Sequence, residues 1–134
     1  MSAFTNYAEN KIIKAIFGNT SLSTLGDGIY VALFNEIADG EIASVTEVTG
    51  TAYSRKQVIA AKWNTDSVTG EARNTDTIDF GTAGGSWGTV KHVGIYDAAT
   101  GGNLWMYGAL SAQRVVNTND PVGFASGTLI CKVL

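Results

Sequence analysis

The amino-acid sequence predicts an all-β domain, a sandwich or barrel, preceded by one short α-helix at the N-terminus. Two observations support this fold class. About eight short segments of alternating apolar character follow one another at spacings of about 8 to 14 residues. The composition is that of a turn-rich β protein, with 16 glycines, one proline and only 16% charged residues. The chain has 134 residues and shows no linker or internal repeat, so we expect a single domain over residues 1–134.

The helix is predicted over residues 6–17. Asn6 can cap its first turn, and Glu9 three residues later completes a capping-box pattern. A helix of about three turns is marginal in isolation, so its apolar face should pack on the chain's own sandwich or, alternatively, in a groove of another subunit. The apolar side chains that recur at helical spacing are Ile12, Ile13, Ile16 and Phe17.

The β-sandwich is predicted over residues 28–134. Its first strand, 28–34, is apolar on both faces and should therefore be covered on both sides. Residues 35–51 are rich in Glu, Gly, Ala and Thr, which predicts a long loop with at most a short helical piece. Further strands are predicted over residues 53–63, 75–80, 89–96, 103–110, 112–116, 122–125 and 128–134.

Charge and cysteine usage argue against several function classes. The net charge is −3 and the nine Lys and Arg residues are scattered, so we expect no nucleic-acid partner, because affinity for phosphate comes from clustered cations. No apolar run approaches the roughly 20 residues of a membrane span, and the N-terminus lacks a signal-peptide pattern. Cys131 is the only cysteine, so no intrachain disulfide is possible. We expect a chain made in a cytoplasm, with no membrane partner.

The sequence offers no catalytic or metal-binding motif. His92 is the only histidine, and it lies within a predicted strand without a triad motif around it. One His and one Cys do not suffice for a zinc site, and the acidic residues between 66 and 79 are scattered. The glycine-rich segment 81–88 lacks the Gly-Lys-Ser/Thr ending of a phosphate loop. We therefore expect neither an enzyme nor a cofactor, and a small hydrolase is the weakest of the function classes.

Several segments together resemble one protein family. The pattern N-Y-x-E-N-K-[IL]-[IL] spans 6–13, [IL]-Y-V-A-L-F spans 29–34, and E-V-[ST]-G-x-x-Y-x-R-[KQ] spans 47–56. The most specific segment is W-G-T-V-x-H-x-G-I-[YF]-D-A-A-T-G-G-N-L, over 87–104, and Y-G-A-L and N-x-x-D follow it. With these segments the chain resembles a family of small structural proteins of tailed bacteriophages. Its members are often labelled tail-fibre-like, and some are similar to capsid cement or decoration proteins.

The resemblance implies a β-sandwich of jelly-roll type, a homo-oligomer such as a dimer or trimer, and no catalysis. It implies a virion structural protein made in the host bacterial cytoplasm. The main hypothesis is a cement protein on the capsid surface, which binds the major capsid protein outside the head and stabilises contacts between capsid subunits. The alternative is a tail-fibre or baseplate module that binds host glycan or other tail proteins.

Four residues are candidate contacts with a partner: Phe4, Tyr7, Arg55 and Trp87. Arginine and aromatic side chains dominate the energetics of interfaces, and the surface carries few charges that would need desolvation. Trp87 also fits a second role, as a lid on the core. The predicted loop 35–51 and the connector 81–87 could reach across to neighbouring subunits.

Overall fold

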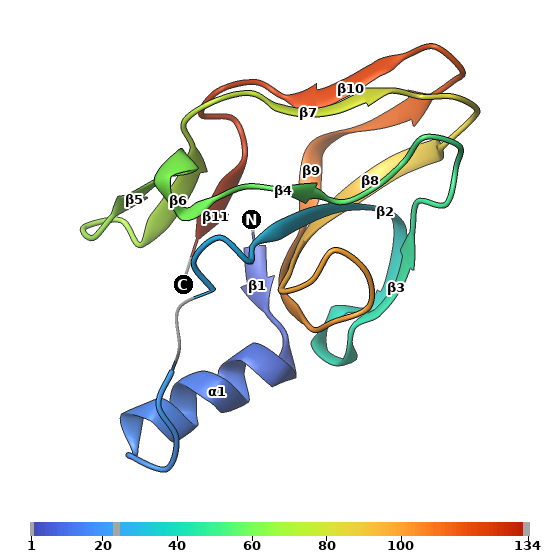
Figure 1. The fold of residues 1–134 in the computed structure, drawn as a ribbon. Coiled ribbons are helices and arrows are strands. Elements are labelled where there is room, and N and C mark those ends of the chain that lie inside the picture. Colours follow the sequence, from blue (N-terminus) through green and yellow to red (C-terminus); the bar gives the residue numbers. More distant parts are fainter. Residues whose placement is uncertain (1, 23–24, 133–134) are drawn as a thin grey trace.

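The computed structural model describes residues 2–22 and 25–132, and it is mainly antiparallel β structure with one N-terminal α-helix (Figure 1). Among the described residues, no helix is long and apolar enough to cross a membrane. The elements follow in the order β1 (Ser2–Phe4), α1 (Asn6–Ile16), β2 (Tyr30–Asp39), the 3₁₀ turn η1 (Gly40–Ile42), β3 (Ser44–Glu47), β4 (Lys56–Gln57), the 3₁₀ turn η2 (Ala60–Lys62), β5 (Trp63–Asp66), β6 (Glu71–Asn74), β7 (Ile78–Thr82), β8 (Gly88–Tyr96), β9 (Leu104–Val116), β10 (Pro121–Phe124) and β11 (Ile130–Lys132).

The strands form one large sheet and two small ones. The large sheet has the order β1-β9-β8-β2-β3, and β4 pairs with the first residues of β2. β7 pairs with β10, and β11, β6 and β5 form a separate three-stranded sheet. All of these pairs are antiparallel. The mainly β prediction is therefore confirmed, whereas the pairing does not show the jelly-roll arrangement.

Helix α1 covers the predicted range almost completely, but its cap differs from the prediction. Thr5, in extended backbone conformation, is the N-cap, and its Oγ1 accepts a hydrogen bond from the Ala8 N–H at 3.2 Å. The predicted cap at Asn6 is thus wrong by one residue. The reason is tertiary, because the Thr5 hydroxyl also donates to the Leu104 carbonyl of β9 at 2.6 Å and so fixes where the helix begins.

Two sequence-based assignments, one loop and one strand, are wrong because contacts with other segments of the chain decide the structure. In the predicted loop 35–51, β2 continues to Asp39, and β3 follows after η1 as an edge strand, where polar side chains face solvent at little cost. The predicted strand 53–63 pairs only over β4 and at Trp63, the first residue of β5. After β4 the chain turns, because the Ala60 N–H donates to the Asp27 carboxylate at 3.0 Å instead of to a neighbouring strand.

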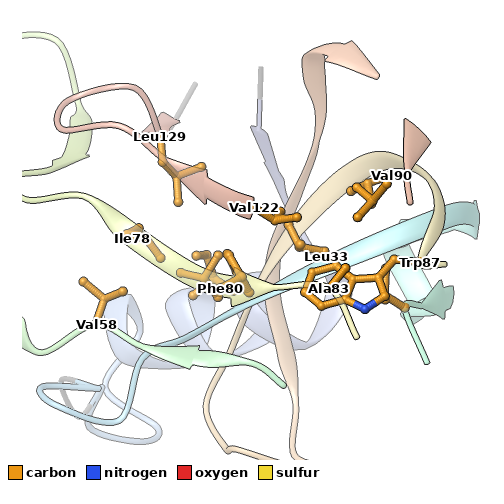
Figure 2. Close-up of a cluster of buried hydrophobic side chains, with 13 residues drawn as sticks. Leu33, Val58, Ile78, Phe80, Ala83, Trp87, Val90, Val122 and Leu129 are labelled. Carbon is orange, nitrogen blue, oxygen red and sulfur yellow. The ribbon is translucent and has the colours of Figure 1, made fainter. Parts of the chain in front are cut away.

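The main hydrophobic core lies on one face of the large sheet, against β7, β10 and the loops beside them (Figure 2). A second cluster lies on the opposite face, built from Ala32, Phe34, Tyr96 and Leu104. β2 is therefore buried on both sides, as its apolar sequence predicts. Side chains of the main cluster that Figure 2 labels include Leu33, Val58, Ile78, Phe80, Ala83, Trp87, Val90, Val122 and Leu129.

Gly94 makes the second cluster possible. A Cβ atom at this buried position of β8 would lie 2.5 Å from Cε2 of Phe34 and 2.8 Å from Cδ1 of Leu104. With glycine there, the Phe34 ring has room against β8 and meets Tyr96 edge to face, with 6.1 Å between ring centroids.

Candidate functional site

Helix α1 is attached to the large sheet mainly through its first turn. Ala8 is fully buried, and the Tyr7 ring meets Trp105 of β9 edge to face, with 5.4 Å between centroids. The Lys11 ammonium lies 5.5 Å from the centre of the Tyr7 ring. Beyond this turn the helix extends away from the sheets (Figure 1). The first turn therefore fixes the direction of a helix whose second half projects outward.

The projecting half presents an apolar surface, here called the helix face, made of Ile13, Ile16 and Phe17. These side chains are 50%, 68% and 72% exposed, and their spacing places them together on one side of the helix. Of the predicted face, Ile12 is half-buried, whereas the other three side chains are exposed, so the expectation that the face packs on the chain's own sandwich is wrong for Ile13, Ile16 and Phe17. Large apolar side chains that cluster on a surface mark an interaction site more often than isolated ones do.

A second apolar surface, here called the apolar groove, lies between β1, the segment before β2, and the sheet of β5, β6 and β11. Its volume is about 480 Å³. Burial raises the pKa of Cys131 within it to about 11, so the thiol stays protonated and inert at neutral pH. None of the described residues that line it is charged: Phe4, Leu25, Gly26, Ile29, Ala60, Trp63, Thr65, Ala72, Ile95, Trp105, Met106 and Cys131.

Arg55 is engaged within the chain. Its Nε and Nη2 donate to the two carboxylate oxygens of Glu47 at 3.0 and 2.9 Å, and its Nη1 donates to the carbonyls of Ala98 and Gly101 at 2.9 and 2.8 Å. Its guanidinium lies 3.5 Å from the centre of the Tyr96 ring, and the side chain is only 8% exposed. Burial by itself lowers the pKa of Arg55, but the bonds and charge of Glu47 outweigh it and raise the pKa. Arg55 therefore holds the turn after β8 against β3 and β4.

Trp87 lies in the main core and is 2% exposed (Figure 2). Its Nε1–H donates to the Thr51 carbonyl at 2.9 Å, and its ring meets Tyr53 edge to face at 5.5 Å. The structure thus assigns Trp87 the role of a lid on the core. As a partner contact it remains a prediction, although the indole has almost no surface to offer a partner.

The four candidate contacts are not gathered in one place. Phe4 lines the apolar groove, whereas Tyr7 and Arg55 line a separate, polar hollow of about 460 Å³ between the start of α1, η1 and the turn after β8. Asn6 and Asn103 also line this hollow. Trp87 lines neither. Their roles as contacts stay predictions, and only Phe4 and Tyr7 lie at surfaces open to a partner.

The apolar spacing of the helix-face residues is visible in the sequence, which offers two places for the face: the chain's own sandwich or a groove of another subunit. The sequence carries no signal that chooses between them, because the tertiary contacts of Thr5 and Tyr7 with β9 set the direction of the helix. His92 lies half-buried in β8, between Phe34 and Ala109 of the neighbouring strands. In the described ranges, 2–22 and 25–132, no three His, Cys, Asp or Glu side chains are grouped to hold a metal ion.

The chain matches the model of a known protein family. Residues 3–132 match the model of a protein family described as Podophage GP4 fiber I protein gp80. The match covers nearly the whole chain and includes α1 and all three sheets. No curated protein matches the chain.

Proposed function

Since the chain belongs to the podophage GP4 fiber I protein gp80 family, a family of phage tail-fibre structural proteins, we propose that it is a fibre module that docks onto other protein chains of the phage tail. The chain is a phage structural protein and a fibre component of the virion, and it is not an enzyme. The sequence-based expectations of a virion protein and of no catalysis are confirmed at this level. The family favours the tail-fibre alternative over the capsid cement hypothesis.

The observation that carries the proposal is the exposed helix face. Burying a fully exposed large apolar side chain stabilises a complex by roughly 1.5–3 kcal/mol. Because Ile13, Ile16 and Phe17 are 50%, 68% and 72% exposed, together they offer about 3–6 kcal/mol. A dissociation constant of 1 μM corresponds to about 8 kcal/mol, so neighbouring contacts must supply the remainder and also offset the cost of association. The helix is also well placed for docking, because its first turn is anchored to β9 and its apolar end points outward.

A capsid cement role would use the same apolar surface, against the major capsid protein in place of a tail protein. The geometry of the helix face fits either partner. Only the match to the fibre family favours the tail. The location of the chain in the virion therefore distinguishes the fibre role from the cement role.

Host glycan binding is a second candidate function, favoured by the polar hollow. It combines the Tyr7 ring, which is 37% exposed, with the side chains of Asn6 and Asn103. An aromatic ring beside amide groups is the combination that sugar recognition uses, because rings stack on C–H faces while amides bind hydroxyls. A glycan-binding assay on wild-type protein and a Tyr7→Ala variant tests this function.

Cryo-EM of purified virions tests the main proposal. We expect density for the chain at the tail or its fibres, and a loss of that density in virions carrying Phe17→Ser. Virions carrying Val115→Ser are the matched control, because Val115 is also an exposed apolar residue, at 59%, but lies at the end of β9. Density at symmetric joints of the capsid shell would establish the cement role instead. Full occupancy of the Phe17→Ser chain would exclude the helix face as the docking surface.

A further inference from the structure

We propose that the polar hollow binds an uncharged sugar unit of a host surface polysaccharide and selects it over sugars that carry a carboxylate or a phosphate. One face of the sugar ring lies against Tyr7. The hydroxyl groups of the sugar bind Arg55, Glu41 and Asn103. This inference rests on the second candidate function, glycan binding at this hollow, and adds the chemical class of the sugar and the side chains that select it.

Arg55 lines the hollow and brings one unused hydrogen-bond donor to it. A guanidinium carries five N–H groups. Four of them are bonded within the chain: that of Nε and one of Nη2 to Glu47, and both of Nη1 to the carbonyls of Ala98 and Gly101. Within residues 2–22 and 25–132 the second Nη2 N–H has no acceptor, although the side chain is only 8% exposed. A donor in so buried a group favours a ligand that brings an oxygen atom to it.

The hollow also offers hydrogen-bond acceptors. Oε1 of Glu41 accepts from the Tyr107 hydroxyl at 3.0 Å, while Oε2 accepts no bond from the described part of the chain. Asn103 donates its side-chain amide N–H and its backbone N–H to Asp97, at 3.1 and 2.7 Å, so its side-chain carbonyl faces no donor of the described residues. A sugar hydroxyl both donates and accepts, so one ring can use the Arg55 N–H and these oxygens together.

Tyr7 supplies the apolar surface that a sugar ring needs. Its side chain is 37% exposed, and the edge-to-face contact with Trp105 holds the ring in place. Ile42, which is 68% exposed, adds a second apolar side chain to the lining. The negative face of an aromatic ring attracts the C–H groups of a pyranose, whose hydroxyl groups then point toward the polar lining. A volume of about 460 Å³ lies within the range of roughly 300–1,000 Å³ that is common for ligand sites.

The charge of the lining selects against acidic sugars. Of the described residues that line the hollow, two are charged, Glu41 and Arg55. The carboxylate of Glu47 lies 2.9 Å from Arg55 and neutralises it, so the negative charge of Glu41 remains without a cation of its own in the lining. A carboxylate or phosphate that enters the hollow therefore meets a like charge, whereas an uncharged hydroxyl does not.

Further charged groups near the hollow are mostly acidic. Burial raises the pKa of Tyr107, which binds Glu41, and the hydrogen bond and charge of Glu41 and the charges of Asp39 and Glu9 raise it further. These carboxylates thus act on the same side of the hollow. The Lys11 ammonium, 5.5 Å from the centre of the aromatic ring that the sugar contacts, offsets only one of these charges.

Binding of the full chain to an array of bacterial surface oligosaccharides tests the selectivity. The array presents each backbone in an uncharged form and in a form with a carboxylate or phosphate group. We expect the wild-type chain to bind uncharged forms, Tyr7→Ala to weaken this binding about tenfold, and Tyr7→Phe, which keeps the ring, to bind as the wild type does. Circular dichroism confirms that each variant is folded.

Glu41→Gln tests the role of charge. Glutamine keeps an acceptor oxygen and removes the negative charge, so uncharged forms should bind as before and carboxylated forms about tenfold more tightly. Glu36→Gln is the matched control, because Glu36 is an exposed carboxylate that pairs with Lys91 and does not line the hollow. Unchanged selectivity in Glu41→Gln overturns the proposal.

The array also separates the class of sugar from glycan binding itself. A wild-type preference for carboxylated or phosphorylated forms that Tyr7→Ala abolishes would overturn the uncharged sugar and leave glycan binding at the hollow standing. Absence of binding to every form would overturn both. The docking of the helix face is decided separately, by the location of the chain in virions.

Discussion

Replacing Trp87 with alanine should strongly destabilise the protein. The indole is 2% exposed, packs edge to face with Tyr53 and donates its N–H to the Thr51 carbonyl. Truncation of a buried tryptophan to alanine costs about 3–5 kcal/mol, the sum of lost apolar burial and the cavity left behind. The free energy of unfolding of a domain is only about 5–15 kcal/mol, so this single change removes a large part of it.

Urea unfolding followed by circular dichroism measures the effect. With a slope of roughly 1.5–2 kcal/mol/M, a loss of about 4 kcal/mol lowers the urea midpoint by about 2 M. Trp87→Phe is the matched control, because it keeps an aromatic ring in the core. It removes the hydrogen bond to the carbonyl of the exposed Thr51, which costs about 1 kcal/mol, in addition to the loss of burial from the smaller ring.

The competing hypothesis makes the opposite prediction. If Trp87 is a partner contact, Trp87→Ala leaves the urea midpoint within about 0.5 M of wild type and lowers only the affinity for the partner. That outcome would refute the assignment of Trp87 to the core.

Three further predictions concern the turn after β8 and the groove. Arg55→Lys should lower the free energy of unfolding by about 2 kcal/mol, because lysine lacks the planar guanidinium that binds Glu47 and two carbonyls together. An unchanged urea midpoint would contradict the role of Arg55 in holding the turn after β8. Burial raises the pKa of Asp97, but hydrogen bonds from Asn103 and Trp105 outweigh it and lower the pKa. The pKa of Asp97 is about 4 in the unfolded chain and lower in the folded protein. Asp97 should therefore contribute its full stabilisation above about pH 4, and this stabilisation should disappear as the pH falls through the pKa of the folded state. Asp97→Asn should flatten this acid dependence of the urea midpoint, and an equally steep profile would exclude Asp97 as its source. Cys131, with a pKa of about 11, should react with iodoacetamide at pH 8 far more slowly in the native protein than in urea, and equal rates would show that the thiol is not buried.

The sequence predicts the local elements where a single periodicity dominates. The helix was predicted at 6–17 and is observed at 6–16, and the strand at 89–96 was predicted within one residue of β8. The sequence-based prediction is wrong where pairing with another segment decides the extent of a strand. The predicted strands 103–110 and 112–116 form one strand, β9, because both pair with β8 across a bulge.

The candidate contact residues show the same difference between what local sequence predicts and what tertiary contacts decide. Arg55 and Trp87 have side chains typical of interfaces, and the sequence contains no indication that Arg55 would be bound to Glu47, Ala98 and Gly101 or that Trp87 would be covered by Tyr53. Both contacts join segments that are far apart along the chain or in different elements. Residue type predicts what a side chain can do, whereas burial decides whether a partner can reach it.

The sequence by itself determined the mainly β class, the helix with its apolar face and the phage structural family, since these depend on short-range periodicity and on local motifs. Only the tertiary structure decided which surfaces remain open. The Thr5 hydroxyl and the Tyr7 ring fix the direction of α1 through single contacts with β9, at residues about a hundred positions away in the sequence. Because that direction leaves Ile13, Ile16 and Phe17 exposed, the structure decides between the two places that the sequence offers for this face, and leaves these three side chains open to a partner and not packed on the chain's own sandwich.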